Sequence, residues 1–336
     1  MKILVTGGAG YIGTHICVEL VNAGFQPIVI DNFCNSSIQS LSRVEKITGQ
    51  QLNHFNIDVR DRLALRKVFE SHPDIYAVIH LAGLKSLSES INKPSIYYEN
   101  NLGGAMSLCS VMTEFNCKRL VFSSSATVYA KSNGHPIKED YLLSPTSPYG
   151  KSKLFIEQML SDEFISDSSW SIRILRYFNP IGAHYSGLIG ESPTATPSNL
   201  MPLLSQVASG KKDRLLIYGD DYSTSDGSGV RDFIHVMDLA NGHVKAIQSM
   251  TKPGLLTVNL GTGKGSSVFE VINSFESVSG VKVPFEVVSR RKGDTDSCYA
   301  ETSLALQEFD WQSHFNLDDM CRDAWRWQIQ NPNGYE

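Results

Sequence analysis

A tyrosine and a lysine four residues apart could perform acid–base chemistry in this chain. A helix that opens at Tyr149 would bring the ammonium of Lys153 one turn beneath the phenol of that residue. A neighbouring cation favours the phenolate and lowers the pKa of a tyrosine, so that it can accept a proton from a substrate hydroxyl. Ser125 would share the hydrogen bond. Most such tyrosine–lysine pairs are solvated helix faces, so the elements around the pair must decide its role.

The composition indicates a soluble globular protein with a small ligand. With 336 residues, of which 41% are hydrophobic, the chain can form a large core and one large or two modest domains. Its formal net charge of −5 and the lack of a long basic run argue against nucleic acid or an anionic membrane as the main partner.

The cysteines and the N-terminus favour the cytoplasm. The six cysteines include no C-x-x-C pair, so neither a zinc site nor a secreted disulfide framework is expected. Residues 1–6 lead directly into a glycine-rich segment, which leaves no room for a signal peptide, and no run of about twenty apolar residues follows. We expect reduced thiols, no metal, no membrane span and a cytoplasmic location.

A glycine-rich turn joins the first strand to the first helix. The apolar residues 3–6 precede Gly7-Gly8-Ala9-Gly10-Tyr11-Ile12-Gly13, and a helical pattern continues to Val21. Glycines at 7, 10 and 13 allow a tight turn, close approach of backbone amides to a pyrophosphate and close helix packing. The order of strand, glycine turn and helix predicts a dinucleotide site.

An acid at the end of the second strand favours NAD over NADP. The strand at residues 27–30 ends in Asp31, about eighteen positions after Gly13. A carboxylate there can accept hydrogen bonds from a ribose 2′-hydroxyl and would repel a 2′-phosphate. The alternative role of Asp31 is that of a simple turn residue.

Further strands alternate with helices at the spacing of a doubly wound parallel sheet. Strands are expected at residues 55–58, 77–83, 120–123 and 172–177, with helices near 61–70, 95–115 and 150–165. Asp58, Gly83, Ser125 and Asn179 fall at or just past strand ends, where such sheets bind ligands. His80, within a buried strand, is expected to be a packed core residue.

The second half is less regular. A loop is expected over residues 187–197, a helix over 199–210, a strand at 258–261 that returns to the first sheet, and an amphipathic helix over 317–330. Residues 263–267 resemble a phosphate loop only superficially, because they lack the G-x-x-x-x-G-K-[ST] spacing.

These motifs together resemble the extended short-chain dehydrogenase/reductase superfamily, with its Rossmann fold, and within it the UDP-glucose 4-epimerase family. The resemblance is carried by residues 7–13, 31–36, 80–85, 123–129, 149–153, 176–180 and 229–236, and it spans nearly every residue from 2 to 335. It implies tightly held NAD, a UDP-sugar substrate and a homodimer. We expect residues 1–178 plus 232–262 to form the NAD-binding domain, and residues 179–231 plus 263–336 to form a smaller, discontinuous α/β domain for the UDP-sugar.

The resemblance also implies roles for individual positions. The catalytic residues would be Tyr149, Lys153 and Ser125. The cofactor would contact Gly7, Gly10, Tyr11, Ile12, Gly13, Asp31, Asn32, Asn35, Ser36, Asp58, Val59, Leu81, Ala82, Gly83, Lys85, Asn100, Ser123, Tyr149, Lys153, Tyr177 and Phe178. The substrate would contact Lys85, Ser125, Tyr149, Asn179, Asn199, Leu200, Leu216, Tyr218, Arg231, Arg291, Asp294 and Cys298.

The implied reaction is a 4-epimerisation. The Tyr149 phenolate would take the proton of the sugar O4 while hydride passes from C4 to the nicotinamide, and the 4-keto sugar would turn and take the hydride back on its other face. Arginines suit a diphosphate, as Arg231 and Arg291 would here, and Leu216 with Tyr218 could bracket uracil. Arg231 could instead be an ordinary ion-pair residue.

Two departures from related families refine the expectation. Dehydratases and decarboxylases of this fold carry acids after the serine, whereas this chain has Ala126 and Thr127, which leaves epimerisation. Where hexose-restricted members have a bulky tyrosine against the sugar C2 substituent, this chain has Cys298, with Tyr299 one step later. A small residue there predicts that UDP-N-acetylhexosamines are accepted too, and a register error of one residue would reverse this.

Alternatives from other classes remain open. They are an epimerase restricted to UDP-glucose and UDP-galactose, another enzyme that modifies nucleotide sugars, a net dehydrogenase that releases NADH, and a non-catalytic NAD-sensing protein. The last need not keep Ser125, Tyr149 and Lys153 together, as this chain does.

Overall fold

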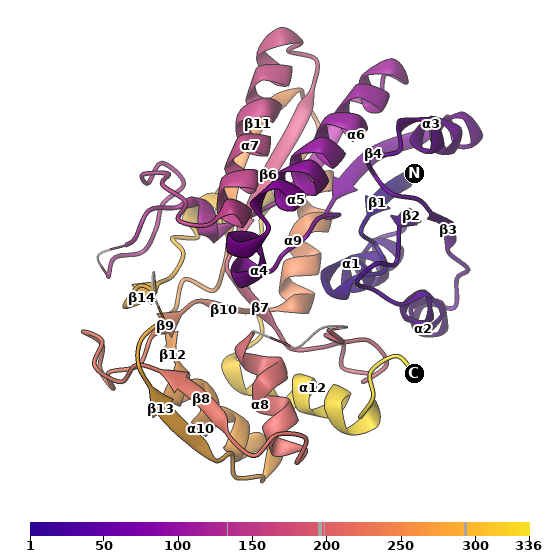
Figure 1. Cartoon of the computed structure of the whole chain (residues 1–336). Coiled ribbons are helices and arrows are strands. Elements are labelled where there is room, and N and C mark those ends of the chain that lie inside the picture. The colour runs from indigo at the N-terminus through magenta and orange to yellow at the C-terminus, as the bar shows by residue number, and fades with distance from the viewer. Residues whose placement is uncertain (133, 194–196, 198, 292–293) are drawn as a thin grey trace.

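A seven-stranded parallel sheet forms the centre of the computed structural model, which describes residues 1–336 except 133, 194–196, 198 and 292–293 (Figure 1). The spatial order is β11-β6-β5-β4-β1-β2-β3. The strands are β1 (Lys2–Thr6), β2 (Gln26–Asp31), β3 (Asn53–Asn56), β4 (Ile75–His80), β5 (Arg119–Ser125), β6 (Ser171–Tyr177) and β11 (Gly254–Leu260). The strand order reverses between β1 and β4, because β2 and β3 are added on one side of β1 and β4 to β6 on the other, so the crevice for a ligand lies above these two strands. The predicted doubly wound sheet is confirmed.

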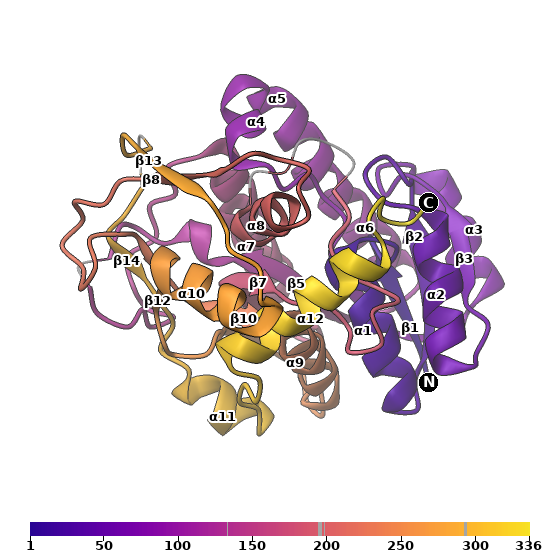
Figure 2. The ribbon, with the colours of Figure 1, turned by 90° about the horizontal axis from the view of Figure 1, so that it is seen from below.

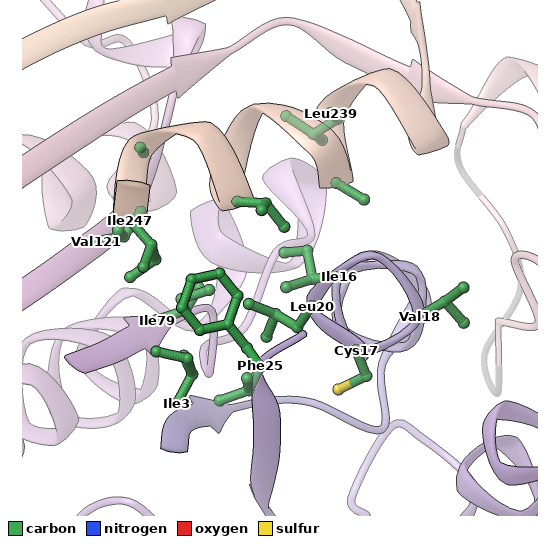
Figure 3. Packing of buried hydrophobic residues seen from close by; sticks show 14 of the residues in the cluster. Ile3, Ile16, Cys17, Val18, Leu20, Phe25, Ile79, Val121, Leu239 and Ile247 are labelled. Carbon is green, nitrogen blue, oxygen red and sulfur yellow. The ribbon is translucent and has the colours of Figure 1, made fainter. Parts of the chain in front are cut away.

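Helices cover both faces of the sheet, which explains why its strands are apolar on both sides. One face carries α1 (Tyr11–Asn22), α2 (Ile38–Thr48), α9 (Val236–Gln248) and α11 (Ser303–Phe309), and the other α3 (Arg62–Ser71), α6 (Gly103–Glu114) and α7 (Pro148–Ser166). In Figure 3, Ile16 and Leu20 of α1 lie between strand residues such as Ile79 and the α9 residue Leu239. Each such buried side chain contributes roughly 1.5–3 kcal/mol.

Sequence-local caps set the bounds of several helices. Ser147 accepts a hydrogen bond from Gly150 N at 3.1 Å and Pro148 occupies the first turn of α7, so this helix begins where the sequence predicts. Asn316 and Asp319 form a capping box at the start of α12 (Leu317–Gln330), whose bounds match the expectation.

Some elements differ from the expectation. The helix expected over 95–115 is divided into α5 (Pro94–Tyr97), a π-helical turn (Tyr98–Leu102) and α6, and it follows the short α4 (Leu87–Asn92). The edge strand β3 ends at Asn56, two residues before Asp58, because it pairs only with β2.

The remaining elements pack around a core of their own. This core includes Leu204 of α8 (Leu200–Ala208), Phe275 of α10 (Val268–Ser279) and Met320 of α12. Short sheets flank it: β7 (Asn179–Ile181) with β10 (Phe233–His235), β8 (Leu215–Tyr218) with β13 (Phe285–Val288), and β9 (Val230–Arg231) between β12 (Ser266–Ser267) and β14 (Ser297–Cys298). The expected loop over 187–197 lies partly outside the described residues.

The expected division into two domains stays a prediction. Ala305 and Phe309 of α11, with Trp311, pack in the core beneath α1 and α9. Figure 2 shows α12 running toward α1 and α2, where the chain ends.

Candidate active site

The glycine turn between β1 and α1 leaves a helix N-terminus without a side-chain cap. Gly7 has a φ of +71°, and a Cβ at Gly13 would lie 2.4 Å from Gly7 O, so neither position tolerates a side chain. Gly10 caps α1 with no side-chain hydrogen bond. The first-turn amides therefore face the crevice above β1 and β4, as a diphosphate requires. Tyr11 donates a hydrogen bond to Gly182 O at 2.7 Å and so links this turn to the segment after β7.

Asp31 at the end of β2 organises the neighbouring loop. Its Oδ2 accepts a hydrogen bond from Ala9 N at 3.0 Å, and its Oδ1 accepts from Phe33 N at 2.9 Å and Ser36 Oγ at 2.8 Å. A carboxylate has about four acceptor sites, which leaves about one for a ribose hydroxyl. This arrangement fits NAD. Asp31 also acts as a turn residue, because it accepts hydrogen bonds from Phe33 and Ser36 in the loop that follows β2.

Asp58 completes this side of the crevice. Arg60 donates to both of its carboxylate oxygens, and Asn32 donates to Oδ2 at 3.2 Å. The hydrogen bonds from Arg60 lower the pKa of Asp58 to about 2. Asp58 is thus an anion beside Asn32, which directly follows β2.

The catalytic candidates meet at the carboxyl end of β5. Ser125 is the last residue of that strand, Tyr149 opens α7, and both side chains are buried. Burial raises the pKa of Tyr149 to about 12, and interaction with the Ser125 hydroxyl acts in the opposite direction. The side chains of Ser125 and Tyr149 therefore lie together at this strand end.

Lys153 differs from its expected position beneath the phenol. Its Nζ donates to Ser123 O at 2.8 Å, and it lies 5.0 Å from the centre of the Phe122 ring and 5.9 Å from that of Tyr149. Burial lowers the pKa of Lys153 to about 8, and the charge of Glu157 raises it. The prediction that Lys153 lowers the pKa of Tyr149 is therefore wrong for the protein alone. Its side chains do not overcome the burial that raises this pKa.

The other cofactor candidates line the same edge of the sheet. Leu81 and Ala82 follow β4, where Leu81 N and Ala82 N donate to Thr6 O and Thr6 Oγ1. The Ser123 hydroxyl lies 2.9 Å from His243 Nε2. Tyr177 and Phe178 follow at the end of β6, and burial raises the pKa of Tyr177. His80 is buried, as predicted, with its Nδ1 2.7 Å from Thr6 Oγ1. Of the remaining positions, Ile12 lies in the first turn of α1, Asn100 in the π-helical turn, and Asn35 and Val59 in the loops that follow β2 and β3.

The expected diphosphate residues lie on the smaller elements. Arg231 on β9 donates to Val230 O and Thr295 O. Its Nη2 lies 3.6 Å from Asp294 Oδ1, so Arg231 forms an ion pair, which was the alternative role considered for it. The Arg291 guanidinium stacks over the Tyr218 ring at 3.8 Å. Asn179 begins β7, and its backbone N–H donates to Asp232 O.

Cys298 and Tyr299 point in opposite directions. Cys298 packs beside the cluster that contains Phe178, and burial raises its pKa to about 11. Tyr299 donates its hydroxyl hydrogen bond to Gly134 O at 2.9 Å. Cys298 and Ala300 both pack in this cluster and Tyr299 between them does not, so the small residue, not the tyrosine, lies on the side of Phe178.

Sequence reasoning missed two polar residues of the site. Glu191 accepts hydrogen bonds from Lys85 Nζ and Asn199 Nδ2, both at 3.2 Å, and so joins two substrate candidates. Asn101, in the π-helical turn, donates to Leu84 O at 3.0 Å and Ser152 Oγ at 3.1 Å. The run Asn100-Asn101 before two glycines was a signal for Asn101, but nothing near Glu191 in sequence indicated its partners.

Two features are absent from the described residues, a membrane-spanning helix and a cluster of metal-binding side chains. In the part of the chain that the structure describes, no helix is long and apolar enough to cross a membrane. The same residues contain no group of three or more His, Cys, Asp or Glu side chains that could hold a metal ion. All six cysteines are free.

Comparisons with known proteins give consistent results. The model of the NAD dependent epimerase/dehydratase family matches residues 3–261. The UDP-glucose 4-epimerase of Dictyostelium discoideum is 51% identical over 99% of this chain and 97% of its own, and that of Bacillus subtilis is 51% identical over 100% and 99%. The crystal structure of the Bifidobacterium longum UDP-glucose 4-epimerase with NAD+ and UDP has a TM-score of 0.96 and 48% identity, and covers 99% of this chain and 100% of its own.

Proposed function

The chain belongs to the NAD dependent epimerase/dehydratase family, with NAD as its cofactor, and from this premise we propose that it interconverts UDP-glucose and UDP-galactose by inverting C4. The observation that carries the proposal is the meeting of Tyr149, Ser125 and Lys153 beyond the carboxyl end of β5, next to the uncapped N-terminus of α1. The similarity to UDP-glucose 4-epimerases over nearly the whole chain supports it.

The proposed roles follow from the positions of the side chains. Bound NAD would accept hydride from the sugar C4 and return it. Tyr149 holds the proton of the sugar O4 during that exchange, Ser125 shares the hydrogen bond, and the ammonium of Lys153 favours the phenolate. Ala126 and Thr127 offer no carboxylate for elimination, so the resulting 4-keto sugar is not dehydrated.

Inversion requires the sugar ring to turn while the nucleotide stays fixed. Arg231 and Arg291 would hold the diphosphate, because guanidinium groups bind phosphate oxygens in a bidentate manner. Leu216, whose side chain is exposed on β8, and Tyr218 would contact uracil. The sugar ring would lie between Tyr149 and Phe178. It would have fewer polar partners there than the nucleotide has, so it could turn and present its other face.

We also propose that UDP-N-acetylglucosamine and UDP-N-acetylgalactosamine are substrates. Cys298 packs beside the Phe178 cluster, whereas Tyr299 is directed to Gly134, so a C2 acetamido group would meet a small side chain. This geometry supports acceptance of the larger substrates as well as the hexoses.

A homodimer is proposed on similar grounds. Leu87 and Ile91 of α4, Ile96 of α5 and Phe155 of α7 are exposed apolar side chains on helices that contact one another. A second copy of the chain would cover them. The cytoplasmic location stays a prediction.

One assay tests the proposed activity. The purified chain is incubated with each of the four UDP-sugars, and the products are separated by chromatography. We expect interconversion within each pair and an ultraviolet absorbance of NAD that survives desalting. Absence of UDP-glucose and UDP-galactose interconversion would contradict the proposal, and net release of NADH would instead identify a dehydrogenase.

A further inference from the structure

Three buried side chains lie on one face of α7 at a spacing of four residues. Tyr149, Lys153 and Glu157 have exposed fractions of 8%, 4% and 6%. Residues four apart on a helix are neighbours, so Glu157 follows Lys153 as Lys153 follows Tyr149. The proposed reaction uses the first two and leaves the buried carboxylate of Glu157 without a role.

Glu157 binds the strand that carries Ser125. The hydroxyl of Ser124 donates to Glu157 Oε1, and Arg176 of β6 donates from Nε at 3.0 Å and from Nη2 to Oε2 at 2.6 Å. Ser124 and Arg176 face each other in the register of β5 and β6. The carboxylate is therefore an anion with a buried cationic partner, and it fixes the residue just before Ser125.

The network extends away from the site through Arg176. Its Nη1 donates to Glu139 O at 2.9 Å and to Tyr129 Oη at 3.1 Å, and Tyr129 donates in turn to Asn259 Oδ1 at 2.6 Å. Four elements, α7, β5, β6 and β11, are held together by it. Glu157 is the one member that lies next to Lys153 on the helix.

Glu157 also balances two buried cations. Apart from burial, its charge is what acts on the pKa of Lys153, and it raises that pKa. The titratable groups near the Tyr149–Lys153 pair from other elements are His80 on β4, Arg176 and Tyr177 on β6, and His243 on α9. None of these four is an anion at neutral pH. Loss of the Glu157 charge would leave Lys153 and Arg176 uncompensated, which is costly for buried charges.

We propose that Glu157 is a positioning residue for the reaction, which holds Ser124 at the end of β5 and places a buried negative charge one helical turn from Lys153. The inference rests on the proposed function, because it assigns Glu157 to the same site. It acts through Lys153 and Ser125 and does not itself touch the sugar.

The test is the pH dependence of the NAD-loaded Glu157→Gln variant. We expect the alkaline limb of kcat to move down by about one pH unit or more, because Lys153 loses its proton at lower pH. The double variant Glu157→Gln/Arg176→Gln removes both charges and should recover part of this shift. Asp162→Asn removes an exposed carboxylate from the same helix and should leave the limb unchanged. An unshifted limb in Glu157→Gln would overturn the proposal.

A second readout uses no sugar. The phenolate absorbance of Tyr149, taken as the difference from a Tyr149→Phe chain, is titrated in the NAD-loaded proteins. We expect the midpoint of the phenolate titration to rise in Glu157→Gln, because a Lys153 that has lost its proton no longer favours the phenolate. In Glu157→Asp, which keeps the charge, the midpoint should stay within a few tenths of a pH unit of the wild-type value. This measurement can hold even if no UDP-sugar is turned over, so the two proposals fail separately. If Glu157→Gln does not fold, Glu157→Gln/Arg176→Gln is compared with Glu157→Asp instead. Equal phenolate midpoints in these two variants would overturn the proposed role of Glu157.

Discussion

The ammonium of Lys153 lies 5.9 Å from the centre of the Tyr149 ring and donates its hydrogen bond to the carbonyl of Ser123 rather than to the phenol. Lys153 therefore acts on Tyr149 as a charge at a distance. At that separation the attraction is still substantial in a buried site. The positive nicotinamide ring of NAD, when bound, would add to this attraction and oppose the burial that raises the pKa of the phenol.

Tyr149→Phe should lower kcat by about a hundredfold to ten-thousandfold, because general acid–base groups contribute about that much. The ring is retained, so bound NAD should remain after desalting. Tyr76→Phe, on the far end of β4, is the control and should keep full activity. Steady-state kinetics with UDP-galactose provide the measurement, and an active Tyr149→Phe enzyme would exclude the phenol as the base.

The free energy of unfolding should fall steeply below pH 6. Burial lowers the pKa of His15 and His80 to about 3 and that of His243 to about 4, from an ordinary value of 6.5. Below pH 6.5 the unfolded chain binds protons that the folded chain does not, so stability is present above that pH and is lost as pH falls toward 4. Each histidine contributes a slope of about 1.4 kcal/mol per pH unit.

Urea denaturation at saturating NAD and a series of pH values measures this slope. His243→Gln should reduce it by one proton, whereas replacement of the exposed His54 by Gln should leave it unchanged. Equal slopes in the wild type and His243→Gln would show that His243 is not held neutral.

Gly13→Ala should weaken NAD binding by about tenfold to a hundredfold. The new Cβ would lie 2.4 Å from Gly7 O and 2.6 Å from Gly8 Cα, so the turn must shift, at a cost of about 1–3 kcal/mol. A Cβ at Gly103 meets no atom within 4 Å, which makes Gly103→Ala the matched control. Retention of NAD on a desalting column compares the two, and equal retention would contradict a tight diphosphate turn.

Cys298→Tyr should lower kcat/KM for UDP-N-acetylglucosamine by about tenfold or more relative to UDP-glucose, because the larger ring fills the space beside Phe178. Tyr299→Phe removes only the hydroxyl that bonds Gly134 O, and it should leave the ratio of the two substrates unchanged. A wild-type chain inactive toward the N-acetyl substrates would end the proposal for this pocket.

The sequence predicts those parts of the fold whose cause is local. The turn at Gly7–Gly13, the strands of the central sheet and the start of α7 at Pro148 each follow from a short pattern of glycine, apolar or capping residues. The small sheets do not, since β8 and β13 are four residues long and join parts of the chain about seventy residues apart. Their pairing depends on tertiary packing, which no local pattern encodes.

The same distinction holds for the candidate site. Tyr149, Lys153 and Ser125 could be found from spacing and strand position, but the direction of the Lys153 ammonium could not, because it depends on the carbonyl of Ser123 on another element. Glu191 was missed since its partners, Lys85 and Asn199, come from separate segments.

The C-terminal residues Trp327 and Tyr335 contact α2 in the N-terminal part of the chain. Arg43 of α2 donates to Leu188 O at 3.2 Å and lies over the rings of Trp327 and Tyr335, while β11 becomes the neighbour of β6 only after residue 254 has been made. During synthesis on the ribosome, the open edge of β6 must wait for its last strand, and the nucleotide half cannot close before the tail emerges. The β6 edge therefore stays open until β11 has been made, and during that interval it is the part that chaperones would have to shield.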